Sequence, residues 1–136
     1  MSTVHLECTE EQAAIVCRAL DAYMRLCGLG QFGELAFHWA GRAAVTVDRA
    51  RLEQPLREFH YLVMPTSLAG YLGASYGIHA TEVPDEYRAS FDLQQVVRHA
   101  LHLARPESDR VGYTVDAYPA RRTSEKHALA KCEVRR

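Results

Sequence analysis

Long apolar runs are missing from this sequence, and so is any large excess of one charge. No run approaches the roughly 20 apolar residues that a membrane-spanning helix needs. The first residues, MSTVHLECTEEQ, turn acidic without the basic and then apolar pattern of a secretion signal. The formal net charge is −1 with histidine neutral, so no overall positive field favours a nucleic-acid polymer. We therefore expect a cytoplasmic protein that binds neither membranes nor nucleic-acid polymers.

Paired cysteines and the standard catalytic signatures are also absent. The four cysteines, Cys8, Cys17, Cys27 and Cys132, form no C-x-x-C pair, so we expect buried or half-buried reduced thiols and no structural zinc. There is no G-x-S-x-G elbow and no H-E-x-x-H helix. The stretch GLGQFG at 28–33 differs from the dinucleotide fingerprint and lacks a preceding strand. These absences predict no cofactor, no metal and no catalytic residues.

A pair of histidines keeps an enzymatic alternative open. His99 and His102 lie three residues apart on a predicted helix, so both could face one metal ion. A third ligand would have to come from His38, His60 or His79. Separate histidines explain the pattern more simply. A small metal- or histidine-dependent nucleotide-processing enzyme remains an alternative, and so does a protein–protein interaction module.

What the sequence does contain is typical of one globular domain over residues 1–136. Hydrophobic residues make up 48% of the chain and charged residues 24%, which is enough to bury a core. Thr9 and Gln12 form a capping box that predicts a helix from there to the glycines at 28–30. Further helices are expected at 34–40, 49–64 and 83–105, and the glycine-rich stretch 68–76 is not expected to be helical.

Alternating apolar residues predict strands at three places. They lie at 3–8, at 111–115 and at 128–134. We expect the N-terminal strand to join the C-terminal hairpin in one small antiparallel sheet that packs with the helices. The sequence therefore predicts an α+β fold.

Two stripes run along the helix expected at 83–105, which Pro84 opens and Pro106 stops. One stripe is apolar and is expected to face the core: Ala89, Leu93, Val96, Val97, Ala100, Leu103 and Ala104. The stripe beside it mixes aromatic, amide, guanidinium and imidazole groups: Tyr87, Phe91, Gln94, Gln95, Arg98 and His102. This second stripe is either a half-exposed shoulder or one wall of a pocket for a phosphate and a flat ring.

Arg98 is the residue of that stripe that most needs a partner. A desolvated guanidinium is costly when unpaired, so Arg98 should meet either a carboxylate of the protein or a ligand phosphate, which it can bind with two hydrogen bonds. The carboxylates considered are those of Glu7, Glu34 and Asp92. Arg25, near the end of the first helix, is a second candidate for the phosphate. The aromatic candidates to stack on a base are Phe32, Tyr71 and Tyr76.

Two blocks of the sequence resemble a known family. One is ALDAYMRL at 19–26 running into GQF at 30–32, and the other is YGIH at 76–79 followed by VP at 83–84 and FDLQQVVRH at 91–99. Together they resemble small phage proteins that act as anti-Thoeris sponges. Members of that family sequester cyclic ADP-ribose signals made by bacterial TIR-domain defence proteins, and some also bind the cyclic oligonucleotides of the CBASS system.

The resemblance implies a function and an assembly. It implies a small antiparallel sheet flanked by helices, and a homodimer or higher homo-oligomer with the ligand at the subunit interface. It also implies a phage-type anti-defence protein in the host bacterial cytosol that binds a cyclic ADP-ribose isomer without cleaving it, and is therefore not an enzyme. Which isomer or cyclic oligonucleotide binds, the size of the oligomer and the presence of a second site are left open.

The same resemblance assigns roles to individual residues. Arg98 matches the principal phosphate-binding arginine, and Arg25 matches a second arginine that the partner subunit contributes. Tyr71 and His79 match the aromatic and polar residues of the family pocket. The family has an asparagine near His79, and this chain has none there, which leaves the ligand identity open. The remaining candidates are Gln95, Tyr76, His102 and Phe32 for the ligand, and Arg121 with Arg122 for a second anion site.

Overall fold

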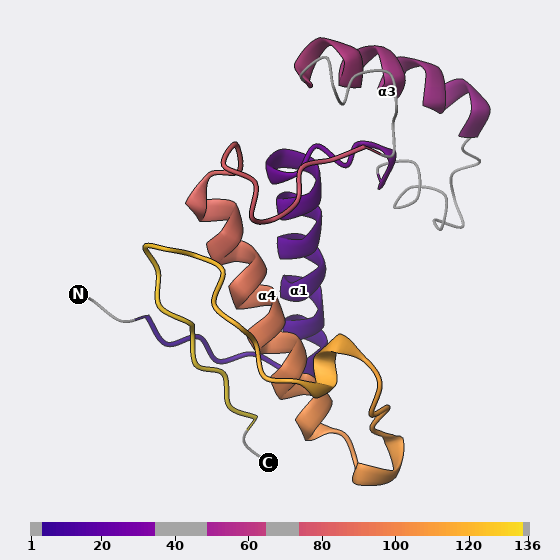
Figure 1. Cartoon of the computed structure of the whole chain (residues 1–136). Coiled ribbons are helices and arrows are strands. Elements are labelled where there is room, and N and C mark those ends of the chain that lie inside the picture. The colour runs from indigo at the N-terminus through magenta and orange to yellow at the C-terminus, as the bar shows by residue number, and fades with distance from the viewer. Residues whose placement is uncertain (1–3, 35–48, 65–73, 135–136) are drawn as a thin grey trace.

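The computed structural model describes residues 4–34, 49–64 and 74–134 (Figure 1). Tyr71, His38 and the helix expected at 34–40, apart from its first residue, lie outside the described residues. The elements in chain order are α1 (Glu10–Tyr23), the π-helical turn η1 (Met24–Gly28), α3 (Arg49–Val63), α4 (Asp85–Ala104), and the short 3₁₀ helices η2 (Glu107–Asp109) and η3 (Val115–Ala117). The helices expected from the sequence at the three long segments are thus confirmed.

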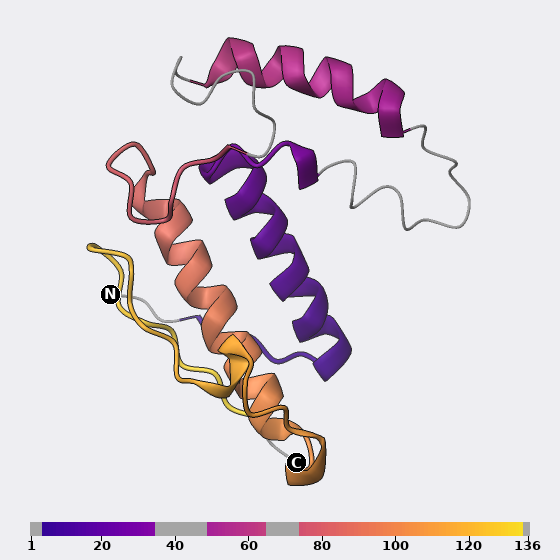
Figure 2. The same cartoon turned by 45° about the vertical axis from the view of Figure 1, so that its right-hand side comes forward.

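α1 and α4 form an antiparallel pair at the centre of the molecule (Figures 1 and 2). Near the middle of α1, the Sγ atom of Cys17 lies 3.9 Å from the carbonyl oxygen of Gln94. Near its end, the rings of Tyr23 and Tyr87 lie 5.1 Å apart. Because later residues of α1 meet earlier residues of α4, the two helices run in opposite directions.

Local signals in the sequence set the ends of these helices. The Thr9 Oγ1 atom accepts a hydrogen bond from the Gln12 N–H at 3.2 Å, and the Thr9 N–H donates to Gln12 Oε1 at 2.9 Å, which confirms the capping box. η1 continues α1 to Gly28, and Gly30 follows with φ +72°, a conformation that favours glycine. Pro84 is the N-cap of α4, so that helix begins at the residue after the proline.

Gly28 marks the closest approach of η1 to α4. A Cβ atom at this position would lie 2.6 Å from Cγ of Tyr87, closer than two carbon atoms can pack. The small core of the described residues lies at the same end of the helix pair, centred on Met24, Leu29 and Val83. Partly buried residues around it are Tyr76, Ile78, Ala80, Tyr87 and Phe91.

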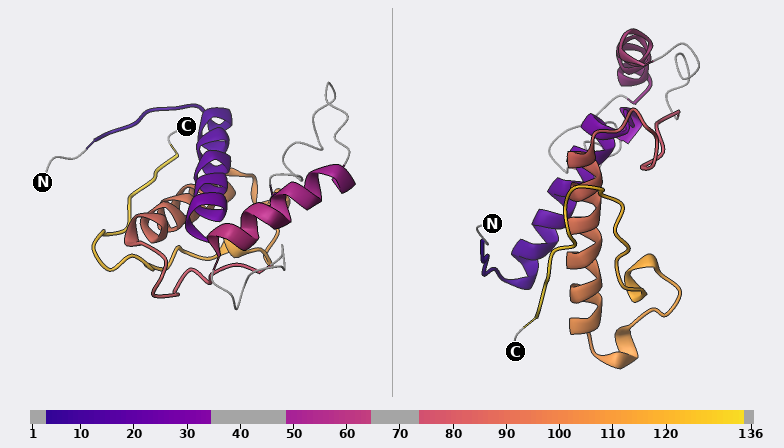
Figure 3. Two further views of the ribbon diagram at one scale, coloured as in Figure 1. Left: turned by 90° about the horizontal axis from the view of Figure 1, so that it is seen from above. Right: turned by 60° about the vertical axis from the view of Figure 1, so that its left-hand side comes forward.

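α3 lies beyond that end of the pair, across the axes of α1 and α4 (Figure 3). Its contacts run through Phe32, whose ring lies 4.9 Å from that of Phe59 and 5.8 Å from that of His60. His60 is fully buried, and its Nε2 atom lies 3.1 Å from the Ala74 carbonyl oxygen. Pro55 falls inside α3 rather than ending it. Within the described ranges, none of the helices is long and apolar enough to cross a membrane.

The predicted α+β fold is wrong, because residues 4–34, 49–64 and 74–134 contain helices and no β-strand. The segments at 4–8 and 128–134 have no regular secondary structure and pair with no neighbour as strands, with Val4 and Leu6 exposed. The segment at 111–115 turns and then enters η3. Alternation describes side chains along a segment, but a sheet also needs a partner for the backbone N–H groups.

The backbone that should have led into the second hairpin strand is instead bound to α4. The N–H groups of 123–126 donate to the carboxylates of Asp85 and Asp92, and we call this arrangement the carboxylate clamp. Asp92 is only 3% exposed. Because the clamp holds this segment along the helix, the chain after α4 runs back beside α4 (Figure 2).

The apolar stripe of α4 is not the buried face that the sequence predicted. Leu93 and Leu103 of the apolar stripe are 37% and 48% exposed, while the buried residues of the helix are mainly polar. They are Arg88, Asp92, Gln94, Gln95, Ala100 and His102. Polar residues are buried here because α1 on one side and the clamped segment on the other supply hydrogen-bond partners.

All four cysteines are free thiols, but their burial differs from the expectation. Cys17 is buried, whereas Cys8, Cys27 and Cys132 are exposed. Cys8 and Cys132 lie in the two segments that were expected to be strands, and the missing sheet leaves these residues without the cover it would have given.

Candidate functional site

An open groove of about 310 Å³ lies between α1 and α4, with η3 at its edge. Ten residues line it: Ala14, Cys17, Arg18, Asp21, Arg25, Gln94, Arg98, Leu101, Arg105 and Asp116. Four of these are arginines and two are aspartates, so the groove carries a net positive charge although the chain does not. We call it the arginine groove.

Arg25 lies at one end of the groove and is held by its own helix. Its Nε atom donates to both carboxylate oxygens of Asp21, at 3.0 and 2.9 Å, because residues four apart lie on one helical face. Its Nη1 atom donates to Gln31 Oε1 at 2.9 Å, and Gln31 in turn donates to the Ser75 hydroxyl at 3.2 Å. The Arg25 side chain is nevertheless 37% exposed, so a solute can reach it.

Arg98 lies on the opposite wall and is paired with η3. Its Nη2 atom lies 2.7 Å from Oδ1 of Asp116, with the two side chains 38% and 24% exposed. The Asp116 carbonyl oxygen lies 2.7 Å from the His99 ring Nδ1, which fixes η3 against α4. Oδ1 of Asp116 is buried and accepts no well-aligned hydrogen bond from the described residues, so this contact is an ion pair rather than a directed hydrogen bond.

Two glutamines position Asp21 from the other helix. Gln94 Nε2 donates to Asp21 Oδ1 at 3.0 Å, and Gln95 Nε2 donates to Gln94 Oε1 at 3.0 Å. Both glutamines are buried. Cys17 lies beside them on the groove wall. Burial raises the pKa of its thiol, and the nearby charges of Arg98 and Arg18 oppose that rise only in part.

The structure brings together two of the predicted ligand-binding residues, Arg25 and Arg98, in one groove of one chain. Gln95 does not line the groove, but it is buried and donates a hydrogen bond to Gln94, which does. His102 is buried on α4 and does not line the groove either. The others lie elsewhere: Tyr76 packs on the core cluster, Phe32 packs on α3, His79 is exposed in the turn before α4, and Tyr71 is outside the described residues.

Sequence reasoning overlooked Arg18, Asp21, Arg105 and Asp116. A signal for three of them was available in the helical period. Residues 14, 18 and 21 of α1 and residue 25 of η1 recur at steps of three and four, as do residues 94, 98 and 101 of α4 and its C-cap residue 105. Asp116 gave no such signal. It reaches Arg98 only because η3 forms where a strand was expected, and it takes the place of the carboxylates considered from the sequence.

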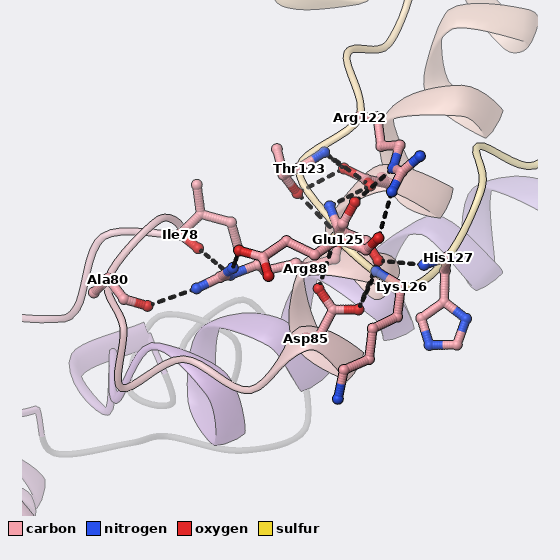
Figure 4. Close-up of polar contacts among 11 residues, drawn as sticks. Ile78, Ala80, Asp85, Arg88, Arg122, Thr123, Glu125, Lys126 and His127 are labelled. Atoms are coloured by element: carbon pink, nitrogen blue, oxygen red, sulfur yellow. Dashed lines mark hydrogen bonds and ion pairs between the residues drawn. The ribbon is translucent and has the colours of Figure 1, made fainter.

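Arg122, one of the two residues of the predicted second anion site, lies beside the carboxylate clamp (Figure 4). Arg121 and Arg122 are both exposed. Arg122 Nε donates to the Ser124 carbonyl at 2.6 Å and its Nη2 donates to the Glu125 carbonyl, so this guanidinium holds its own turn together. The second guanidinium of the region is that of Arg88.

Arg88 anchors the turn before α4 to the clamp. Its Nη2 and Nε atoms donate to the carbonyls of Ala80 at 2.9 Å and Ile78 at 3.2 Å, and its Nη1 donates to Glu125 Oε1 at 3.2 Å (Figure 4). Arg88 is buried, and its donors are directed at protein acceptors. The guanidinium groups of Arg88 and Arg122 are therefore both directed at acceptors of the protein itself.

In the part of the chain that the structure describes, no three His, Cys, Asp or Glu side chains gather closely enough to hold a metal ion. No family model, curated protein or solved structure matches this chain.

Proposed function

We propose that this protein binds a small phosphate-bearing ligand in the arginine groove and sequesters it unchanged. The observation that carries the proposal is that Arg25 and Arg98, from two helices far apart in sequence, line one groove. By resemblance to the anti-Thoeris sponges, the proposed ligand is a cyclic ADP-ribose isomer and the proposed setting is phage anti-defence. Cyclic oligonucleotides are the second ligand class to examine.

The charges of the groove support a phosphate ligand. A guanidinium forms two parallel hydrogen bonds with a phosphate as it does with a carboxylate, so a phosphate can replace Asp21 or Asp116 as a partner without leaving any donor unpaired. Both arginines are more than a third exposed, so the exchange does not require the helices to separate.

The size of the groove suits the phosphate part of a nucleotide. Ligand pockets commonly span about 300–1,000 Å³, and this groove lies at the lower end of that range. We therefore propose that a second subunit of a homodimer or larger homo-oligomer covers the rest of the ligand. The homo-oligomer is part of the proposal and follows from the resemblance.

Sequestration, rather than turnover, is proposed from the chemistry of the lining residues. Both groove carboxylates are engaged by arginines, which disfavours their use as a general base. The raised pKa of the Cys17 thiol lowers the fraction of the nucleophilic thiolate near neutral pH.

Isothermal calorimetry of the purified protein with a panel of cyclic ADP-ribose isomers tests the proposal. We expect saturable binding of at least one isomer, and recovery of that isomer intact by chromatography after the complex is denatured by heat. A folded protein that binds no isomer and no cyclic oligonucleotide would refute the proposal. A ligand recovered in cleaved form would favour an enzyme instead.

A further inference from the structure

Two of the four groove arginines have no acidic partner in the part of the chain that the structure describes. Arg25 is paired with Asp21, and Arg98 with Asp116. Arg18 and Arg105 line the same groove, and neither makes an ion pair with a described carboxylate. Both are exposed, so their charges are accessible to a solute entering the groove.

The antiparallel packing sets the order of the four guanidinium groups along the groove. Asp21 and Cys17 contact Gln94, which places Arg18 beside the turn that carries Arg98. Seven residues span about 10 Å of a helix axis, so Arg25 and Arg105 lie about two turns away, at opposite ends. The charges of Arg98 and Arg18 both act to lower the pKa of the Cys17 thiol, as expected for two charges near the middle of the groove.

We infer that Arg18 and Arg105 are anion-binding residues of the groove, and that their unpaired charges select a ligand with two linked phosphate charges over one with a single charge. The inference rests on the proposed binding function and extends it to two further residues. Arg18 and Arg98 meet one phosphate at the middle of the groove, and Arg105 meets the charge of the next phosphate toward the end.

A second consequence concerns the two aspartates. In the structure they hold Arg25 and Arg98, so an incoming phosphate competes with them for the same donors. Asp21 and Asp116 therefore weaken binding of an anion and suppress binding of weakly charged solutes. Removing one of these negative charges should strengthen anion binding, although it removes an internal contact.

The test uses inorganic pyrophosphate and inorganic phosphate as probes, measured by calorimetry at low salt beside the cyclic ADP-ribose isomers. We expect pyrophosphate to bind more tightly than phosphate. Arg18→Ala/Arg105→Ala should weaken pyrophosphate binding by at least about tenfold, the scale of one charged hydrogen bond. Asp116→Asn and Asp21→Asn should each strengthen it. Arg57→Ala is the control for the loss of a surface charge, because Arg57 is 53% exposed on α3 and, among the described residues, its ion pair is a 3.8 Å contact with Glu53.

The outcomes separate this inference from the proposed function. If an isomer binds the wild type and the Arg18/Arg105 double variant equally, the inference is wrong and the sequestering function stands. Suppose that no isomer binds, that pyrophosphate does, and that the Arg18/Arg105 double variant loses pyrophosphate binding while Arg57→Ala keeps it. The inference then holds and the proposed ligand is wrong. If Asp116→Asn and Asp21→Asn both weaken pyrophosphate binding while keeping the wild-type melting temperature, the competition between carboxylate and phosphate is refuted. If Arg57→Ala lost as much affinity for pyrophosphate as the double variant, the loss would be due to net charge. The assignment of Arg18 and Arg105 as anion-binding residues would then be wrong.

Discussion

Two pairs of aspartates in this protein accept contacts of similar length, but one pair is bound by backbone N–H groups and the other by arginine side chains. In the carboxylate clamp, Asp85 and Asp92 accept hydrogen bonds from backbone N–H groups at 2.7–3.2 Å. In the arginine groove, Asp21 and Asp116 face guanidinium groups at 2.7–3.0 Å. A backbone donor cannot leave its partner unless the chain moves, whereas an arginine side chain needs only a change of rotamer.

The difference explains why we assign one region to the stability of the fold and propose the other as the binding site. Asp92 is almost fully buried, and its two oxygens are shared among the N–H groups of Thr123 and Ser124 and the Thr123 hydroxyl. The groove arginines remain partly exposed while paired. A ligand can therefore enter the groove by exchanging partners, but it cannot enter the clamp without unfolding it.

Asp92→Ala should have the largest effect. It leaves the N–H groups of Thr123 and Ser124 without acceptors in a buried region, and each unsatisfied group costs about 1–3 kcal/mol. We expect a loss of about 3 kcal/mol in the free energy of unfolding, measured by urea denaturation. Asp92→Asn retains one acceptor oxygen and should fall between this variant and the wild type. A loss below about 0.5 kcal/mol in Asp92→Ala would show that the clamp does not stabilise the fold.

Arg98→Ala and Arg25→Ala should weaken ligand binding and affect stability less than Asp92→Ala. Each removes a charged hydrogen bond to the proposed phosphate, so we expect affinity for the cyclic ADP-ribose isomer to fall by more than ~1 kcal/mol, or about fivefold. Exposed ion pairs contribute only about 0–1 kcal/mol to folding. Calorimetry gives the affinity and thermal melting gives the stability. Unchanged affinity in both variants would remove the groove from consideration as the site.

Acid should open the clamp at Asp85 as the pH falls through the lowered pKa of this carboxyl. Burial acts to raise the pKa of this carboxyl, but hydrogen bonds from Glu125 and Lys126 N–H and the Ser124 hydroxyl, with the charge of His127, hold the pKa below its ordinary value. A lowered folded-state pKa stabilises the fold above the ordinary value of about 3.9, and this stabilisation is lost as pH falls through the folded-state pKa.

Amide hydrogen exchange of Glu125 and Lys126, followed by NMR from pH 6 downward, measures this opening. We expect their protection, relative to intrinsic exchange rates, to fall below the ordinary carboxyl pKa of about 3.9, as the pH drops through the lowered pKa of Asp85, and protection in α1 to change less over this step. In Asp85→Asn the acid-induced step should disappear because the side chain no longer titrates. Protection that decreases at the same pH in the clamp and in α1 would indicate one global transition instead.

The smallest effect should be on the chemistry of Cys17 in the groove. Burial and a raised pKa slow its reaction with iodoacetamide, so the exposed Cys8 and Cys27 should be labelled first near pH 8. Mass spectrometry of the labelled protein gives the order. Saturating ligand should slow Cys17 further and leave Cys27 unchanged. If a bound ligand does not change the rate at which Cys17 is labelled, that ligand lies outside the groove.

The helices could be predicted because their signals are local. Thr9 with Gln12, and Pro84 with the acidic residues after it, specify helix starts within a few residues of sequence. The sheet was predicted wrongly because alternation does not reveal whether a partner strand exists. The clamp explains the outcome, since Asp92 takes donors that lie 31 residues further along the chain.

The site was predictable only in part for a similar reason. The sequence predicted Arg98 as a binding residue because its charge lies next to an apolar stripe. It predicted Arg25 as a second arginine for the same phosphate. Their antiparallel juxtaposition depends on how α1 packs on α4, which no single segment encodes. The burial of polar residues on α4 was unexpected because hydropathy patterns assign polar groups to solvent. Gln94 and Asp92 are buried because other segments provide acceptors and donors for them.

Gly28 gives the groove a fixed scale. Because a Cβ atom at Gly28 would lie 2.6 Å from Cγ of Tyr87, η1 and α4 touch at this point, and a side chain here would push them apart. The contact therefore sets how closely η1, which carries Arg25, approaches α4, which carries Arg98. If the arginine groove binds an anion as proposed, Gly28 would help to set the spacing of the arginines around that anion without touching it.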